Sequence, residues 1–175
     1  LAMRATQRSL GTILHQDICQ PLGIDFFIGT PESERHRAAE IRKPSRAGEF
    51  GEITPPRKAA FFTPWATAKR DTPLWKRIEI PSANGHGTAL AVARLFETYA
   101  TGGLIGGSRV LSQEAFDALA TRRFNGSDLV LPFEMGWRTG IIGNSNKFYG
   151  PNPEALGHSG SGGSCGFGDP VAGVS

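Results

Sequence analysis

The sequence is poor in cysteine, with only Cys19 and Cys165 among its 175 residues. Two cysteines form neither a disulfide framework nor, at this separation, a C-x-x-C metal or redox site, so we expect two reduced thiols. The four histidines include no H-E-x-x-H motif and no i,i+4 pair, which excludes the common zinc patterns. Phosphate-binding loops of the G-x-x-x-x-G-K-[ST] and G-x-G-x-x-G types are also absent. We therefore expect no metal and no other cofactor.

Long apolar runs and clusters of like charge are missing as well. No run approaches the ~18–20 apolar residues of a membrane-spanning helix, so no membrane association is expected. The net charge of +3 is divided unevenly, with +5 over residues 1–77 and −2 over residues 78–175. In the positive half, Lys and Arg are scattered among acids and prolines, so the sequence does not predict nucleic-acid binding.

Apolar residues at helical spacing mark the first part of the chain. They predict a helix over about residues 3–20. A second helix is predicted from Thr30 as N-cap and Pro31 at the first helical position, and runs to about Lys43. Ser112 can cap a short helix further on. The most regular repeat lies between Gly87 and Gly102 and consists of Ala89, Val92, Ala93, Phe96 and Ala100.

Residues 44–81 have a different composition. Six prolines interrupt any long helix or strand, and five aromatic residues lie among them. A flexible linker would be poor in aromatic residues, so we predict a long ordered loop packed over the body of the protein. Such loops often border active sites.

From Phe133 onward the pattern changes to short strands and turns. Large and small residues alternate in Phe133–Trp137, a turn is predicted at Gly143–Asn146, and Ala155–His158 leads into a glycine-rich tract. The order predicts an α+β fold, with helices first and antiparallel strands after them. The chain opens within a helical pattern and stops at GDPVAGVS, where alternation suggests a new strand, so we expect an internal section of a longer protein.

The glycine-rich tract, Gly157–Gly168, has the highest density of chemically useful groups. Its glycines allow a ligand to approach the backbone, whose exposed N–H groups can bind an oxyanion; a tight strand corner is the structural alternative. Ser164 lies in a G-x-S-x-G match, but glycines and Pro170 follow where a nucleophile elbow needs a helix, and no histidine follows. We therefore do not assign Ser164 as the nucleophile.

Five blocks together carry a family resemblance: RSLGTILHQDICQPLGIDFFIGTPE, IPSANGHGTALAVARLFETYATGG, RVLSQEAF, FEMGW and LGHSGSGGSCGFGDP. In order and spacing they resemble the serine β-lactamase superfamily, and within it the class C-like carboxylesterases of family VIII. The resemblance implies an antiparallel sheet flanked by helices plus a helical region. Residues 1–175 would form part of that domain, with 1–130 mainly helical and 131–175 the start of the later strands.

The resemblance also implies roles for single residues. The family uses a Ser-x-x-Lys motif, a tyrosine motif and a third motif on a strand beside the nucleophile. His158, Ser159 and Gly160 match the third motif; His158 and Ser159 would face the substrate, and Gly160 would leave room for it. The backbone N–H of Ser161 would be one oxyanion-hole donor.

Two further contacts with a substrate follow from the same resemblance. The loop over residues 44–81 would shape the rim of the pocket, with Trp65 and Trp75 as candidate substrate-binding residues.

The first two motifs are absent, because no lysine has a serine three residues before it and neither Tyr99 nor Tyr149 lies in the tyrosine motif. We expect a parent serine hydrolase that acts on carboxylic esters or β-lactams, and a chain that is inactive by itself.

Two other interpretations stay open. The chain could belong to a non-catalytic protein of the same fold that serves in binding or as a scaffold, which a missing Ser-x-x-Lys upstream would indicate. It could also be an unrelated glycine-rich binding module whose basic half meets an anionic partner. Retention on heparin with a strong salt dependence would indicate that second alternative.

Overall fold

The computed structural model describes residues 1–41, 51–64, 72–160 and 162–175. The chain divides into two compact units. Unit 1 comprises Leu1–Leu14, Phe27–His86 and Ser127–Phe133, and unit 2 comprises His15–Phe26, Gly87–Gly126 and Glu134–Ser175. Among the described residues, no helix combines the length and the apolar character that crossing a membrane requires.

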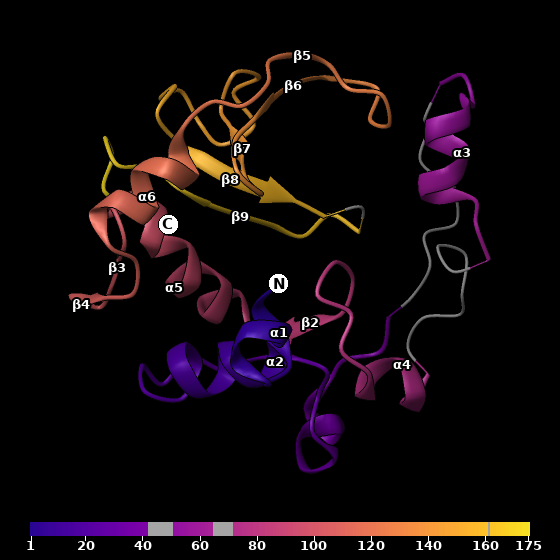
Figure 1. Cartoon of the computed structure of the whole chain (residues 1–175), viewed down its shortest axis with the longest axis vertical. Helices are drawn as coiled ribbons and strands as arrows, with labels where there is room; N and C mark the ends of the chain where they lie inside the picture. The colour runs from indigo at the N-terminus through magenta and orange to yellow at the C-terminus, as the bar shows by residue number, and fades with distance from the viewer. Residues whose placement is uncertain (42–50, 65–71, 161) are drawn as a thin grey trace. The chain divides into compact units, whose positions relative to one another are not determined.

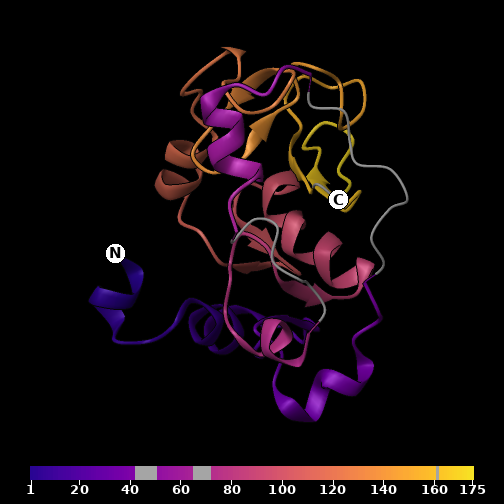
Figure 2. The ribbon, with the colours of Figure 1, turned by 90° about the vertical axis from the view of Figure 1, so that its right-hand side faces the viewer.

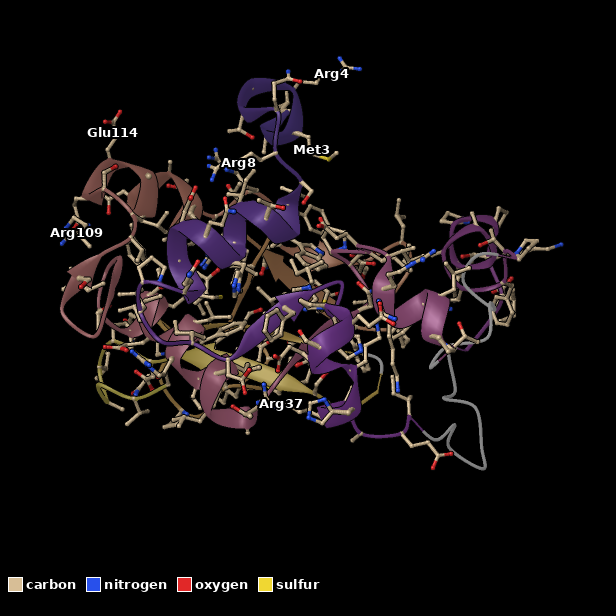
Figure 3. The ribbon with its side chains drawn as sticks, turned by 90° about the horizontal axis from the view of Figure 1, so that it is seen from below. Met3, Arg4, Arg8, Arg37, Arg109 and Glu114 are labelled. Atoms are coloured by element: carbon tan, nitrogen blue, oxygen red, sulfur yellow. The ribbon has the colours of Figure 1, made fainter. Side chains whose placement is uncertain are left out.

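The predicted helix over residues 3–20 is wrong as a single helix. The segment forms α1 (Ala2–Thr6), α2 (Leu10–Leu14) and the π-helical turn η1 (His15–Cys19). Gln7 ends α1 with a left-handed backbone (φ 57°), and the N–H of Thr12 donates to the hydroxyl of Ser9 as α2 begins. Ser9 also donates to Glu79, 70 residues away, so a long-range contact accompanies the local bond at the start of α2. Met3 projects from α1 with 56% of its surface exposed (Figure 3).

The second predicted helix is shorter and tighter than expected. Glu32–Arg37 forms the 3-10 helix η2, whose N-cap position is Pro31 and not Thr30. The N–H of Thr30 donates to the carbonyl of Lys76 at 2.7 Å, which ties this residue to another part of unit 1. Residues 42 and 43 of the prediction lie outside the described part of the chain.

The proline-rich stretch contains two short helices within its described parts. They are α3 (Pro55–Phe61) and α4 (Pro73–Arg77), and both begin at proline. Proline suits a first helical turn because its missing N–H would have no partner there. The prolines therefore interrupt long elements, as predicted, and also start new ones. The guanidinium of Arg57 in α3 donates to the carbonyl of Val130 at 2.7 Å within unit 1.

Two predicted helices of unit 2 are confirmed, and so is the predicted cap at Ser112; the cap at Thr88 was not predicted. Thr88 accepts the N–H of Ala91 and starts α5 (Ala89–Ala100), and Ser112 accepts the N–H of Ala115 and starts α6 (Gln113–Ala120). Both hydroxyls satisfy N–H groups that have no partner inside the helix. Between the two helices, β3 (Leu104–Ile105) and β4 (Ser108–Arg109) form an antiparallel hairpin. A further two-stranded sheet joins β1 (Phe26–Ile28) and β2 (Gly85–Gly87).

The main sheet has five strands in chain order. They are β5 (Gly126–Ser127), β6 (Glu134–Trp137), β7 (Ile142–Gly143), β8 (Leu156–Ser159) and β9 (Cys165–Gly168), and the pairs from β6 to β9 are antiparallel. The strand predicted at 133–137 and the turn after Gly143 are thus confirmed. In place of a strand after GDP there is a turn, bridged from Asp169 to Val174. The predicted α+β order is confirmed.

Helix α5 packs against β8 and β9 inside unit 2 (Figures 1 and 2). The close approach depends on two glycines of β9. A Cβ at Gly166 would lie 2.5 Å from the ring of Phe96, and one at Gly168 would lie 2.6 Å from the backbone of α5. Because no real side chain tolerates such distances, the two glycines allow the helix to lie directly on the strand.

Candidate functional site

The third-motif residues lie at the end of the β8–β9 hairpin. His158 pairs with Gly166 and Ser159 pairs with Cys165 in the antiparallel register. Gly160 follows the strand, and its N–H donates to the carbonyl of Ser164 at 2.7 Å, which closes the hairpin. His158, Ser159 and Gly160 are all exposed, whereas Gly157 just before them is buried. The motif therefore stands where a buried strand emerges to the surface of unit 2.

His158 and Ser159 leave β8 on opposite faces, as successive strand residues do. Residues directly opposite in an antiparallel pair share a face. Because a Cβ at Gly166 would meet Phe96 of α5, His158 lies on the α5 face. The ring centroids of His158 and Trp137 are 6.1 Å apart. Ser159 and Cys165 lie on the other face. That both motif side chains meet one substrate stays a prediction.

On its face, Ser159 meets a tyrosine and a cysteine that sequence reasoning did not assign to the site. The hydroxyl oxygens of Tyr149 and Ser159 are 3.5 Å apart, and Ser159 donates to the sulfur of Cys165 at 3.8 Å. Tyr149 is buried, with 1% of its surface exposed, and its ring stacks on Phe167 with centroids 6.0 Å apart. Burial raises the pKa of Tyr149; its hydrogen bond to Ser159 lowers that pKa, and Cys165 raises it. The phenol is therefore neutral near pH 7.

The loop before β8 holds Tyr149 in place through Asn144. The side-chain oxygen of buried Asn144 accepts the N–H of Tyr149 at 2.9 Å, and its amide donates to the carbonyls of Gly150 and Asn152 at 2.8 Å each. Gly157 makes room for the ring, because a Cβ there would lie 2.7 Å from two ring carbons of Tyr149. The one sequence signal for this arrangement is the turn predicted around Asn144.

The other residues singled out from the sequence have varied placements. Ser164 lies in the β8–β9 connection and is followed by a strand, so the helix that a nucleophile elbow needs is not there. Ser161 and Trp65 lie outside the described residues.

Trp75 lies in α4 of unit 1 and is buried. Its ring and that of His86 are in an edge-to-face arrangement, with centroids 5.6 Å apart. Its carbonyl accepts the side-chain amide of Asn84 at 2.8 Å. Its role as a substrate contact stays a prediction.

Unit 2 also has a hollow of about 500 Å³, lined among others by Phe116, Arg138, Glu154 and Leu156. One terminal nitrogen of Arg138 is buried and makes no hydrogen bond within the described structure. Burial lowers the pKa of Arg138, and the nearby charge of Arg122 lowers it further. None of the site residues predicted from the sequence lines this hollow.

Over residues 1–41, 51–64, 72–160 and 162–175, no three His, Cys, Asp or Glu side chains are grouped as metal ligands.

Comparison with known proteins adds the family. Among curated proteins, the chain is similar to the esterase/beta-lactamase LipL of Mycobacterium tuberculosis, with 31% identity over 193 residues that cover 99% of this chain and 43% of LipL. Among solved structures, a penicillin-binding protein homolog from Caulobacter crescentus matches with 47% identity and a TM-score of 0.91. A family VIII carboxylesterase matches with 33% identity and a TM-score of 0.82. Each of these two matches covers 98% of this chain and 46% of the other.

EstA from Arthrobacter nitroguajacolicus Rue61a shares the fold, with a TM-score of 0.80 at 23% identity over 98% of this chain and 48% of EstA. The chain thus spans less than half the length of each of these proteins. The Beta-lactamase family model matches residues 1–175. The resemblance stated from the five sequence blocks is confirmed, and the chain belongs to the beta-lactamase family.

Proposed function

We propose that this chain is the later section of a serine hydrolase that cleaves carboxylic esters, or β-lactams, through an acyl-enzyme intermediate. The observation that carries the proposal is the His158-Ser159-Gly160 motif at the exposed end of β8, in a chain of the beta-lactamase family. Similarity to an esterase/beta-lactamase and to a carboxylesterase supports the ester as substrate class.

In this proposal the chain supplies the substrate-binding strand and the rest of the protein supplies the nucleophile. The nucleophilic serine oxygen would bond to the acyl carbon as the C–O bond of the ester or the C–N bond of the β-lactam breaks. The serine proton would pass to the departing alcohol or to the ring nitrogen, and water would then hydrolyse the acyl-enzyme. The backbone N–H of Ser161 and that of the nucleophile itself would stabilise the oxyanion. Gly160 suits this place, because even a Cβ there would lie 2.6 Å from the hydroxyl of Ser164.

The coding sequence upstream of Leu1 is the first test. We expect it to encode a Ser-x-x-Lys and, closer to Leu1, a tyrosine motif. The whole protein should then hydrolyse p-nitrophenyl butyrate or nitrocefin, and alanine in place of the upstream serine should abolish the reaction. If the serine and lysine are missing, or if the whole protein hydrolyses neither compound, the proposal is wrong. That result would favour a non-catalytic binding or scaffold protein of the same fold.

A further inference from the structure

The hydroxyl of Ser159 lies between two side chains that differ in hydrogen-bonding ability. On one side is the phenol oxygen of Tyr149 at 3.5 Å, and on the other is the sulfur of Cys165 at 3.8 Å. A serine hydroxyl has one proton to donate, and its geometry allows donation to the sulfur. Either oxygen of the Tyr149–Ser159 pair can be the donor, and when Ser159 gives its proton to the sulfur, the contact between the two oxygens uses the proton of Tyr149.

The burial of Tyr149 also favours donation of its hydroxyl proton to Ser159. The phenol is almost fully buried, and a buried hydroxyl without a partner costs about 1–3 kcal/mol. Ser159 is the hydrogen-bond partner of this hydroxyl within the described residues. The separation is long for an O–H···O bond, as catalytic contacts often are before a ligand binds.

The position of the phenol is set from three directions. Asn144 anchors the backbone of Tyr149, the ring of Phe167 stacks on its ring, and the bare backbone of Gly157 supports its edge. These contacts leave the ring little freedom. The hydroxyl of Tyr149 is therefore preorganised, whereas exposed Ser159 can rotate.

We propose that Tyr149 is a positioning residue that makes Ser159 a hydrogen-bond donor to the substrate. With Tyr149 donating to its oxygen, Ser159 keeps its own proton for another acceptor. A thiol sulfur is a weak acceptor, so a carbonyl or carboxylate oxygen of a bound ester or β-lactam would replace Cys165 as the partner. The chain of two hydrogen bonds would strengthen both. This inference rests on the proposed function and adds a residue outside the three motifs.

The kinetic test uses the whole protein. Tyr149→Phe removes the hydroxyl and keeps the stacked ring, so we expect kcat/KM to fall about tenfold with little change in melting temperature. Ser159→Ala should cause a similar fall. Because the two groups act as one unit, the double variant should lose no more than either single variant. The matched control is Tyr99→Phe in α5, the other tyrosine of the chain, which should behave as the wild type. Wild-type kinetics for Tyr149→Phe would overturn the inference.

A second readout does not depend on activity. The ionisation of Tyr149 can be followed in the whole protein as the difference between the ultraviolet titrations of two proteins that differ only by Tyr149→Phe. Ser159 lowers the pKa of Tyr149, so Ser159→Ala should raise it. An unchanged pKa would overturn the contact and the inference with it. A raised pKa in a protein that hydrolyses no ester would count against the proposed function and leave the contact between Tyr149 and Ser159 established.

Discussion

Gly157 occupies a position where the packing leaves no space for a side chain larger than hydrogen. A methyl group at this buried position would lie 2.7 Å from the ring of Tyr149 and 2.8 Å from the Cβ of Phe167. Both neighbours are packed against the strand, so neither can move cheaply. We expect Gly157→Ala to lower the free energy of unfolding by about 1–3 kcal/mol, as overpacking of a core does. Thermal or urea denaturation measures it.

Gly162 is the matched control, because it belongs to the same glycine-rich tract. A Cβ at Gly162 would meet nothing within 4 Å, and its φ does not lie in the left-handed region. We therefore expect Gly162→Ala to leave stability within about 0.5 kcal/mol of the wild type. If the two variants lost equal stability, the packing of Tyr149 on Gly157 would be wrong.

Asp169 gives the fold a predictable response to acid. Its pKa lies below the ordinary 3.8 because its carboxylate accepts the N–H of Ala172, the amide of Asn152 and the N–H of Val171. A carboxyl with a depressed folded-state pKa contributes stability above its unfolded pKa and loses it as the pH falls through the folded pKa. Asp169→Asn does not titrate, so its melting temperature should drop less between about pH 6 and about pH 3. Asp117→Asn, an exposed carboxyl of α6, is the control; equal drops in all three proteins would contradict the assignment.

At the scale of elements, α5 depends on its first residue. The hydroxyl of Thr88 accepts the N–H of Ala91 at 3.0 Å, and the helix it starts packs on β8 and β9. Loss of an N-cap hydroxyl costs about 1 kcal/mol. We expect Thr88→Ala to lower the free energy of unfolding by about that amount in urea denaturation. Thr88→Ser retains the acceptor and should recover most of the loss; a serine variant as unstable as the alanine variant would show that the cap is not the cause.

At the scale of the whole molecule, we propose that the chain supplies the binding strand of a hydrolase and that the nucleophile lies outside residues 1–175. None of the five lysines follows a serine at a distance of three residues, so these residues contain no Ser-x-x-Lys motif. We expect the purified 175-residue chain to hydrolyse p-nitrophenyl butyrate no faster than its Ser164→Ala variant. Hydrolysis above that level would mean that the glycine-rich tract carries a nucleophile of its own.

Sequence reasoning was most successful where structure is local. The cap at Ser112, the existence of α5 and the strand around Trp137 all follow from residues within a few positions of one another. It was wrong over residues 3–20, where helical spacing continued through a real break. The left-handed Gln7 ends α1 there, and Ser9 contacts Glu79, a residue to which no local pattern connects it.

The order and spacing of short sequence blocks were sufficient to predict the family and the α+β order. What surrounds His158-Ser159-Gly160, the proposed third motif, depends on the tertiary fold. The register of β8 and β9 sends His158 toward α5 and Ser159 toward Cys165, and Asn144 brings Tyr149 to the same face. Strand pairing and side-chain packing join residues that are separate in sequence, and a one-residue change of register would reverse both faces.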